Sequence, residues 1–117
     1  MLDFVLAIIA GLIIGTITGI TPGIHINTIT ALLIAHISIF SFLSITSLVA
    51  FIVSLAITHT ILDFIPSILT GATDDESFLS VLPGHEMLIK GKGREAILLV
   101  ILGALTAIPL ILMITAL

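Results

Sequence analysis

Long apolar runs dominate this sequence and restrict the folds that are open to it. They cover residues 2–20, 26–43, 48–69 and 96–117. A bilayer core of about 30 Å needs about 20 apolar residues in a helix, and a helix satisfies its own backbone hydrogen bonds inside lipid. We therefore predict an all-α, polytopic helical membrane protein. Three of the runs are expected to span fully, whereas 26–43 either spans or re-enters as a broken helix.

The composition supports a membrane environment and excludes several functions. Hydrophobic residues make up 59% of the chain and charged residues 9%, whereas about 25% charged is typical of soluble domains. There is no cysteine, so neither disulfides nor thiolate metal sites are available. With three basic residues and no Trp or Tyr, the chain lacks the basic surface and stacking aromatics of nucleic-acid-binding proteins. We expect a multi-pass protein of the cell membrane that contacts the lipid bilayer and has no cofactor.

The polar stretch 71–95 is predicted to be a cytoplasmic loop within a single transmembrane domain that covers residues 1–117. It holds all the basic residues of the chain, namely Lys90, Lys92 and Arg94, and cytoplasmic loops are enriched in Lys and Arg. The third run then points inward and the fourth outward. If 26–43 spans fully, Met1 lies outside. If a re-entrant hairpin forms between residues 22 and 43, Met1 lies in the cytoplasm.

Part of this polar stretch is predicted to form a short interfacial helix over residues 77–82. Thr73 and the acidic residues at 74–76 are typical of a helix start. Pro83 and Gly84 follow directly, and we expect them to end the helix.

A glycine repeat in the first run predicts close helix packing. Gly11, Gly15 and Gly19 are four residues apart, so they share one face of a helix. Small residues at this spacing let a second helix backbone approach in membrane proteins. We expect these three glycines to serve packing.

The repeat ends in a break that is the strongest candidate for a binding site. Pro22 lacks an N–H group and Gly23 can adopt a positive φ, so a new helix should begin near Ile26. Its first turn would present free N–H groups and the positive end of its dipole, which broken transporter helices use to hold anionic substrates. We predict that the substrate is bound by Gly23, His25, Asn27 and Thr28. The alternative is an ordinary interfacial turn with an Asn cap.

The third run carries the candidate residues for ion coupling. His59 and Asp63 are four residues apart and can meet on one helix face. Ionisable residues inside membrane segments indicate function by default, so this pair could take up a proton or a sodium ion. Pro66 adds a carbonyl ligand by freeing the oxygen of Leu62. The alternative is a structural His–Asp pair that neutralises itself.

Enzymatic sites are not evident. A metal-dependent intramembrane protease would need an H-E-x-x-H helix, but His85-Glu86 is followed by Met-Leu-Ile. No Ser–His or Asp–Asp arrangement stands out. We therefore predict that the protein is not an enzyme.

Three ordered motifs resemble the start of the TctA family, the large membrane subunits of tripartite tricarboxylate transporters. They are Gly15-Thr16-x-x-Gly19-x-x-Pro22-Gly23-x-His25-x-Asn27-Thr28, then His59-Thr60-x-x-Asp63-Phe64-x-Pro66-Ser67, then Leu82-Pro83-Gly84-His85 with Lys90-Gly91-x-Gly93. The match is nearest to an archaeal branch, the DUF112 group, and covers essentially the whole chain. Family members are several times longer, so the resemblance implies the N-terminal part of a longer permease. His25 stands where the bacterial pattern has a glycine.

Taken together, these features predict a membrane permease subunit of a secondary transporter for a small organic anion, such as a carboxylate. Coupling to a proton is expected first, and to sodium otherwise. The rest of a longer permease or a second copy of the chain would complete the site. The main alternative is a membrane scaffold or assembly subunit that does not transport.

Overall fold

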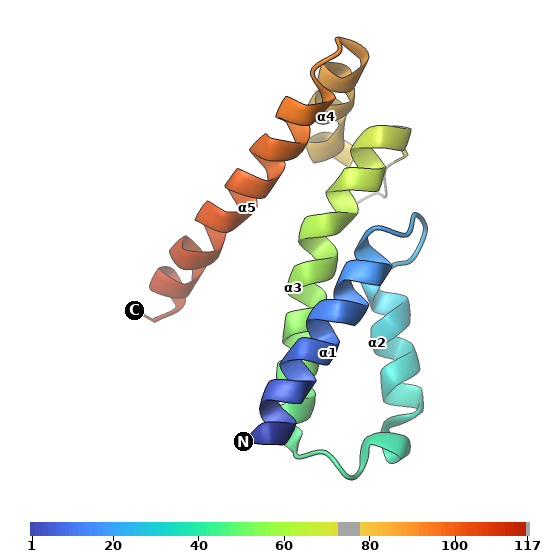
Figure 1. The fold of residues 1–117 in the computed structure, drawn as a ribbon, viewed down its shortest axis with the longest axis vertical. Coiled ribbons are helices and arrows are strands. Elements are labelled where there is room, and N and C mark those ends of the chain that lie inside the picture. The colour runs from blue at the N-terminus through green and yellow to red at the C-terminus, as the bar shows by residue number, and fades with distance from the viewer. Residues whose placement is uncertain (73–77, 117) are drawn as a thin grey trace. The chain divides into compact units, whose positions relative to one another are not determined.

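The computed structural model describes residues 1–72 and 78–116. Every regular element in these ranges is helical, which confirms the all-α prediction (Figure 1). In chain order they are α1 (Leu2–Gly19), α2 (Ile26–Ala35), the short 3₁₀ helix η1 (Ile37–Phe40), α3 (Ile45–Thr70), α4 (Phe78–Ile89) and α5 (Gly93–Thr115). The chain forms two compact units, Met1–Asp63 and Phe64–Leu117, each described separately below. That the chain is a single transmembrane domain stays a prediction.

Within residues 1–72 and 78–116, three helices are long and apolar enough to cross a membrane. They are α1, α3 and α5, with 18, 26 and 23 residues. Their ends agree with the predicted runs to within three residues. In a bilayer of about 30 Å, α3 at about 39 Å has length to spare.

The second apolar run does not form one continuous span. Its helix α2 has only 10 residues, or about 15 Å, and ends where His36 leaves helical geometry with φ −112° and ψ 22°. The ring Nδ1–H of His36 donates to the Leu32 carbonyl at 2.9 Å, the same oxygen that accepts the His36 main-chain N–H at 3.1 Å. The remainder of the run continues as η1 and a turn.

Within the first unit, α1 and α3 lie side by side and run parallel. A Cβ added at Gly11, Gly15 or Gly19 would lie 2.6–2.7 Å from a carbonyl oxygen of α3, those of Phe51, Leu55 and His59 respectively. The residue numbers of the contacting positions increase in the same direction along both helices, so the helices are parallel. The connection through residues 20–44 must therefore return to the end of the unit where α1 begins, as Figure 1 shows.

Helix α3 begins with a side-chain cap. The Ser44 hydroxyl accepts the main-chain N–H of Ser47 at 3.1 Å and lies 2.9 Å from the Ser47 hydroxyl. This satisfies a first-turn donor, as serine at an N-cap position commonly does. Further along α3, Leu55 is buried, and it lines a narrow gap of about 10 Å³ together with Leu33 of α2. Helix α2 therefore packs on α3.

The second unit has a small core where α3 ends. Ile68, Val81 and Ala96 are buried there, at 0%, 0% and 2% exposure. Helices α4 and α5 form an antiparallel hairpin, seen in Figure 1, around the turn at Gly91, which has a φ of +78°. Much of the predicted loop over 71–95 is thus helical.

The predicted end of the short helix at Pro83-Gly84 is wrong, because α4 continues to Ile89. Proline removes one helix hydrogen bond, but at Pro83 the carbonyl concerned belongs to Leu79, close to the start of the helix. Gly84 packs closely against α3, since a Cβ there would lie 2.9 Å from the Ile68 side chain. Thr73 and residues 74–76, the predicted start signal, lie outside the described residues.

Candidate functional site

The break after the glycine repeat forms an extended turn and a new helix. Gly23 has a φ of +83°, and nothing lies within 4 Å of where its Cβ would be. Helix α2 begins at Ile26, where the sequence predicted a restart. His25 occupies the N-cap position in extended geometry, with φ −93° and ψ 140°.

The start of α2 leaves polar groups facing outward. His25, Asn27 and Thr28 are all exposed. The Thr28 N–H donates to the His25 carbonyl at 3.0 Å, and no side chain caps the helix. Asn27 lies inside the first turn and is not the N-cap, so the alternative of an Asn-capped turn is not what forms. The amides of Ile26 and Asn27, which precede Thr28 in the first turn, have no acceptor within their own helix, which is the geometry that suits an anion.

His59 is buried at the contact between α1 and α3. Its exposed fraction is 3%, and its Nδ1 lies 3.0 Å from the Thr18 hydroxyl. The approach depends on Gly19, because a Cβ there would lie 2.7 Å from the His59 carbonyl oxygen. Thr18 was missed by the sequence reasoning. In the sequence, Thr18 is distinguished only by its position next to Gly19, the last glycine of the repeat. Its contact with His59 becomes visible only when α3 is in place.

Asp63 is half-buried, one turn further along α3 from His59. The nearby Pro66 is buried inside α3, so the Leu62 carbonyl lacks its usual N–H partner. Thr58, by contrast, donates its hydroxyl to the Ser54 carbonyl at 2.8 Å and so is satisfied within its own helix.

The two predicted sites lie at the same end of the first unit. A Cβ on Gly19, the last residue of α1, would lie 3.0 Å from both the Cα of His59 and the side chain of Leu62. The turn that carries Gly23 and His25 begins directly after that residue. The fold therefore brings the break next to the part of α3 that holds His59.

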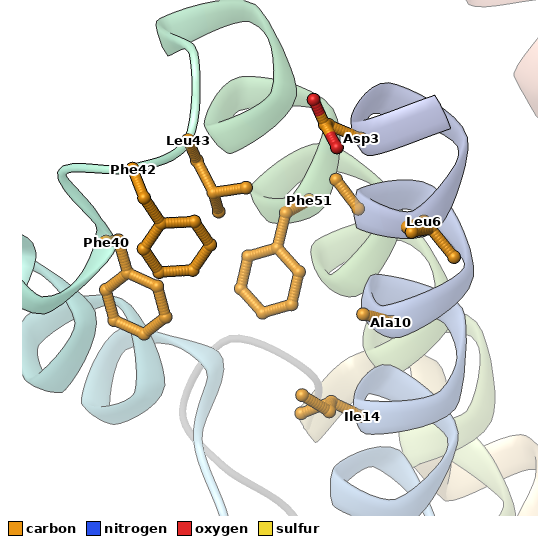
Figure 2. Close-up of a pocket in the computed structure, with 9 residues that line it drawn as sticks. Asp3, Leu6, Ala10, Ile14, Phe40, Phe42, Leu43 and Phe51 are labelled. Atoms are coloured by element: carbon orange, nitrogen blue, oxygen red, sulfur yellow. The ribbon is translucent and has the colours of Figure 1, made fainter. Parts of the chain in front are cut away.

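Two apolar cavities flank α1 and α3 elsewhere in this unit. One, of about 460 Å³, lies between α1, α3 and the segment around η1. Figure 2 shows Phe40, Phe42 and Phe51 on one side of it and Ala10 and Ile14 on the other, with Asp3 at its edge. The other, of about 520 Å³, is lined from Phe4 to Leu12 on α1 and from Thr46 to Thr58 on α3. Neither cavity is lined by a predicted site residue. The first cavity has apolar walls and the Asp3 carboxylate at its edge, which does not suit the binding of an anion.

Comparison with known proteins agrees with the motifs. The model of the tripartite tricarboxylate transporter TctA family matches residues 5–117. The chain is 44% identical over 94 residues to an uncharacterized protein of Methanocaldococcus jannaschii, MJ1079. That alignment covers 80% of this chain and 23% of the relative, so the chain spans less than a quarter of the relative's length. No solved structure matches. The chain, whose described residues include three helices long and apolar enough to cross a membrane, belongs to the tripartite tricarboxylate transporter TctA family.

Proposed function

We propose that the protein is part of the membrane permease of a secondary transporter for a small organic anion, in the cell membrane. The observation that carries the proposal is the family match over residues 5–117. The broken helix supports it, because such breaks form substrate sites in secondary transporters. The remainder of a longer permease, or a second copy of the chain, would complete the site, and the family description implies further subunits.

The proposed substrate contacts are Gly23, His25, Asn27 and Thr28 at the start of α2. No Lys or Arg occurs before Lys90, so the first unit has no fixed cation to neutralise a carboxylate. The helix dipole and first-turn amides of α2 supply partial positive charge instead. A protonated His25 would add a full charge, while Asn27 and Thr28 add side-chain donors.

The proposed coupling residues are His59 and Asp63. Ionisable groups in membrane spans of transporters commonly relay protons, and a proton is the simplest ion for a site with an imidazole. A carboxylate and a freed carbonyl at Leu62 would also suit sodium. Their position beside the break allows ion binding to influence the substrate site.

Uptake of labelled di- and tricarboxylates by cells that express the native gene tests the proposal. Asn27→Ala and Asp63→Asn should abolish uptake while the amount of folded protein stays normal. Matched controls are Ser41→Ala, another exposed polar residue of the first unit, and Asp3→Asn, an acid in the first turn of α1. Both controls should retain uptake.

The outcomes separate the alternatives. Equal loss of folded protein in Asn27→Ala and Asp63→Asn would favour a scaffold or assembly subunit. Uptake that persists when the pH gradient is collapsed would contradict proton coupling, and a sodium dependence would then identify the other ion.

A further inference from the structure

We infer that Thr18 is a positioning residue for His59, which it holds in the Nδ1–H tautomer, so that Nε2 is the ring atom that accepts a proton. The role in coupling rests on the proposed function. The tautomer itself does not, because it follows from hydrogen bonds inside the first unit.

The Thr18 hydroxyl has a single proton to donate. This hydroxyl lies 2.9 Å from the Ile14 carbonyl of its own helix and 3.0 Å from His59 Nδ1. A carbonyl can only accept, so the Ile14 contact is a hydrogen bond only when the hydroxyl donates to it. It is then left with lone pairs toward the ring, and Nδ1 must be the donor.

The opposite assignment leaves a contact unsatisfied. If Thr18 donated to Nδ1, its oxygen and the Ile14 carbonyl oxygen would face each other at 2.9 Å with no proton between them. Two acceptors this close repel each other, and the contact loses a hydrogen bond. One arrangement of protons satisfies both contacts, and it places a hydrogen on Nδ1.

The surroundings hold the pair in place. His59 is 3% exposed, so water does not compete for Nδ1. Gly19 brings the α1 backbone against the His59 backbone, and that contact positions Thr18 beside the ring. The tautomer is therefore imposed by helix packing as well as by side-chain chemistry.

This tautomer determines which atom takes part in proton exchange. In the neutral ring the free lone pair is on Nε2, because Nδ1 carries the hydrogen. After protonation Nδ1 still donates to Thr18, so proton uptake and release at Nε2 need no turn of the ring. Thr18 thus acts as a constant acceptor while Nε2 changes state.

Few other titratable groups belong to this unit. Helix α1, which packs on His59, contributes only Asp3 and the N-terminal amine, both at its opposite end. His25 and His36 flank α2, and Asp63 follows one turn further along α3. Asp63 shares the helix face of His59, and its carboxylate is the group suited to stabilise a charged ring.

Solid-state NMR of the protein, labelled with ¹⁵N-histidine in lipid bilayers at alkaline pH, tests the tautomer directly. His59→Gln identifies the His59 signals among those of the four histidines. The wild-type spectrum should show a protonated Nδ1 and an unprotonated Nε2. A neutral ring with the hydrogen on Nε2 would overturn the inference.

Variants test whether Thr18 is the cause. Thr18→Val keeps the shape but removes the acceptor and should move the hydrogen toward Nε2, whereas Thr18→Ser should not. Thr16→Val is the matched control, because the Thr16 hydroxyl is exposed and bonds only to the Leu12 carbonyl at 2.7 Å. An unchanged Nδ1–H ring in Thr18→Val would exclude Thr18 as the determinant. Should Thr18→Val not fold, wild type and Thr18→Ser still test the tautomer.

Measurements of uptake against pH then test whether His59 takes part in ion coupling. Thr18→Val should shift the pH midpoint of uptake by roughly three- to tenfold in proton concentration, the effect of one hydrogen bond, while Thr16→Val should not. A changed tautomer with an unchanged pH profile would remove His59 from the coupling site and leave the tautomer assignment standing.

Discussion

Individual glycines of this chain have different roles, which differ in the atoms that an added methyl group would contact. At Gly15, a Cβ would lie 2.7 Å from the Leu55 carbonyl oxygen, a backbone atom that cannot yield alone. At Gly103 on α5, nothing lies within 4 Å. The spacing of the repeat was enough to predict that Gly11, Gly15 and Gly19 share a face. It could not identify Thr18, because the role of that residue depends on a histidine 41 positions away.

Gly15→Ala should destabilise the protein by about 1–3 kcal/mol, since overpacking forces α1 and α3 apart. Thermal unfolding in detergent measures this effect. Gly103→Ala is the control and should be neutral or slightly stabilising, because alanine favours helix and meets no neighbour. Equal behaviour of the two variants would contradict close packing at Gly15.

Single elements show where sequence patterns succeed and fail. Hydropathy located α1, α3 and α5 to within three residues, because burial in lipid depends on length and composition. It did not show that 26–43 breaks at His36, or that α4 passes through Pro83, because tertiary contacts decide both. In α4, the contacts of Gly84 and His85 with the end of α3 outweigh the proline.

The end of α3 depends on His85. Its Nδ1–H donates to the Ile68 carbonyl at 2.7 Å, one of the last carbonyls of the helix, which lack partners of their own. Gly71, with a φ of +67°, lies against the same ring.

His85→Phe should cost about 1–3 kcal/mol, because it leaves a buried carbonyl without a donor. The measurement is again thermal unfolding. His36→Phe is the matched control and should have little effect, since the Leu32 carbonyl keeps the His36 main-chain N–H. A stable His85→Phe variant would show that water replaces the ring.

At the scale of the whole molecule, the parallel pairing of α1 and α3 favours one of the two orientations that the sequence left open. Residues 20–44 return to the end of the unit where α1 starts, so we expect Met1 and Ser44 on the same side of the membrane. With the Lys90–Arg94 turn in the cytoplasm, Met1 is expected outside. The sequence alone did not distinguish the two orientations of Met1, because the polar residues in the second run hide whether that run crosses the membrane.

Single-cysteine labelling tests this orientation directly, since the chain has no cysteine of its own. Leu2→Cys and Ser41→Cys should react with a membrane-impermeant maleimide in intact cells. Pro22→Cys and Lys92→Cys should react only after permeabilisation. If Leu2→Cys needs permeabilisation while Ser41→Cys does not, residues 22–43 form a re-entrant hairpin.

The pairing of α1 with α3, rather than with its neighbour in sequence, also bears on how the protein is made. The glycine face of α1 meets its partner carbonyls only at Phe51, Leu55 and His59. Until α3 has been synthesised, that face therefore lacks the helix on which it packs. The first helix must enter the membrane on its own hydrophobicity, and its pairing must wait until the third has followed. Biogenesis of this unit is thus expected to proceed by late docking of α3 onto α1, with α2 already in the membrane.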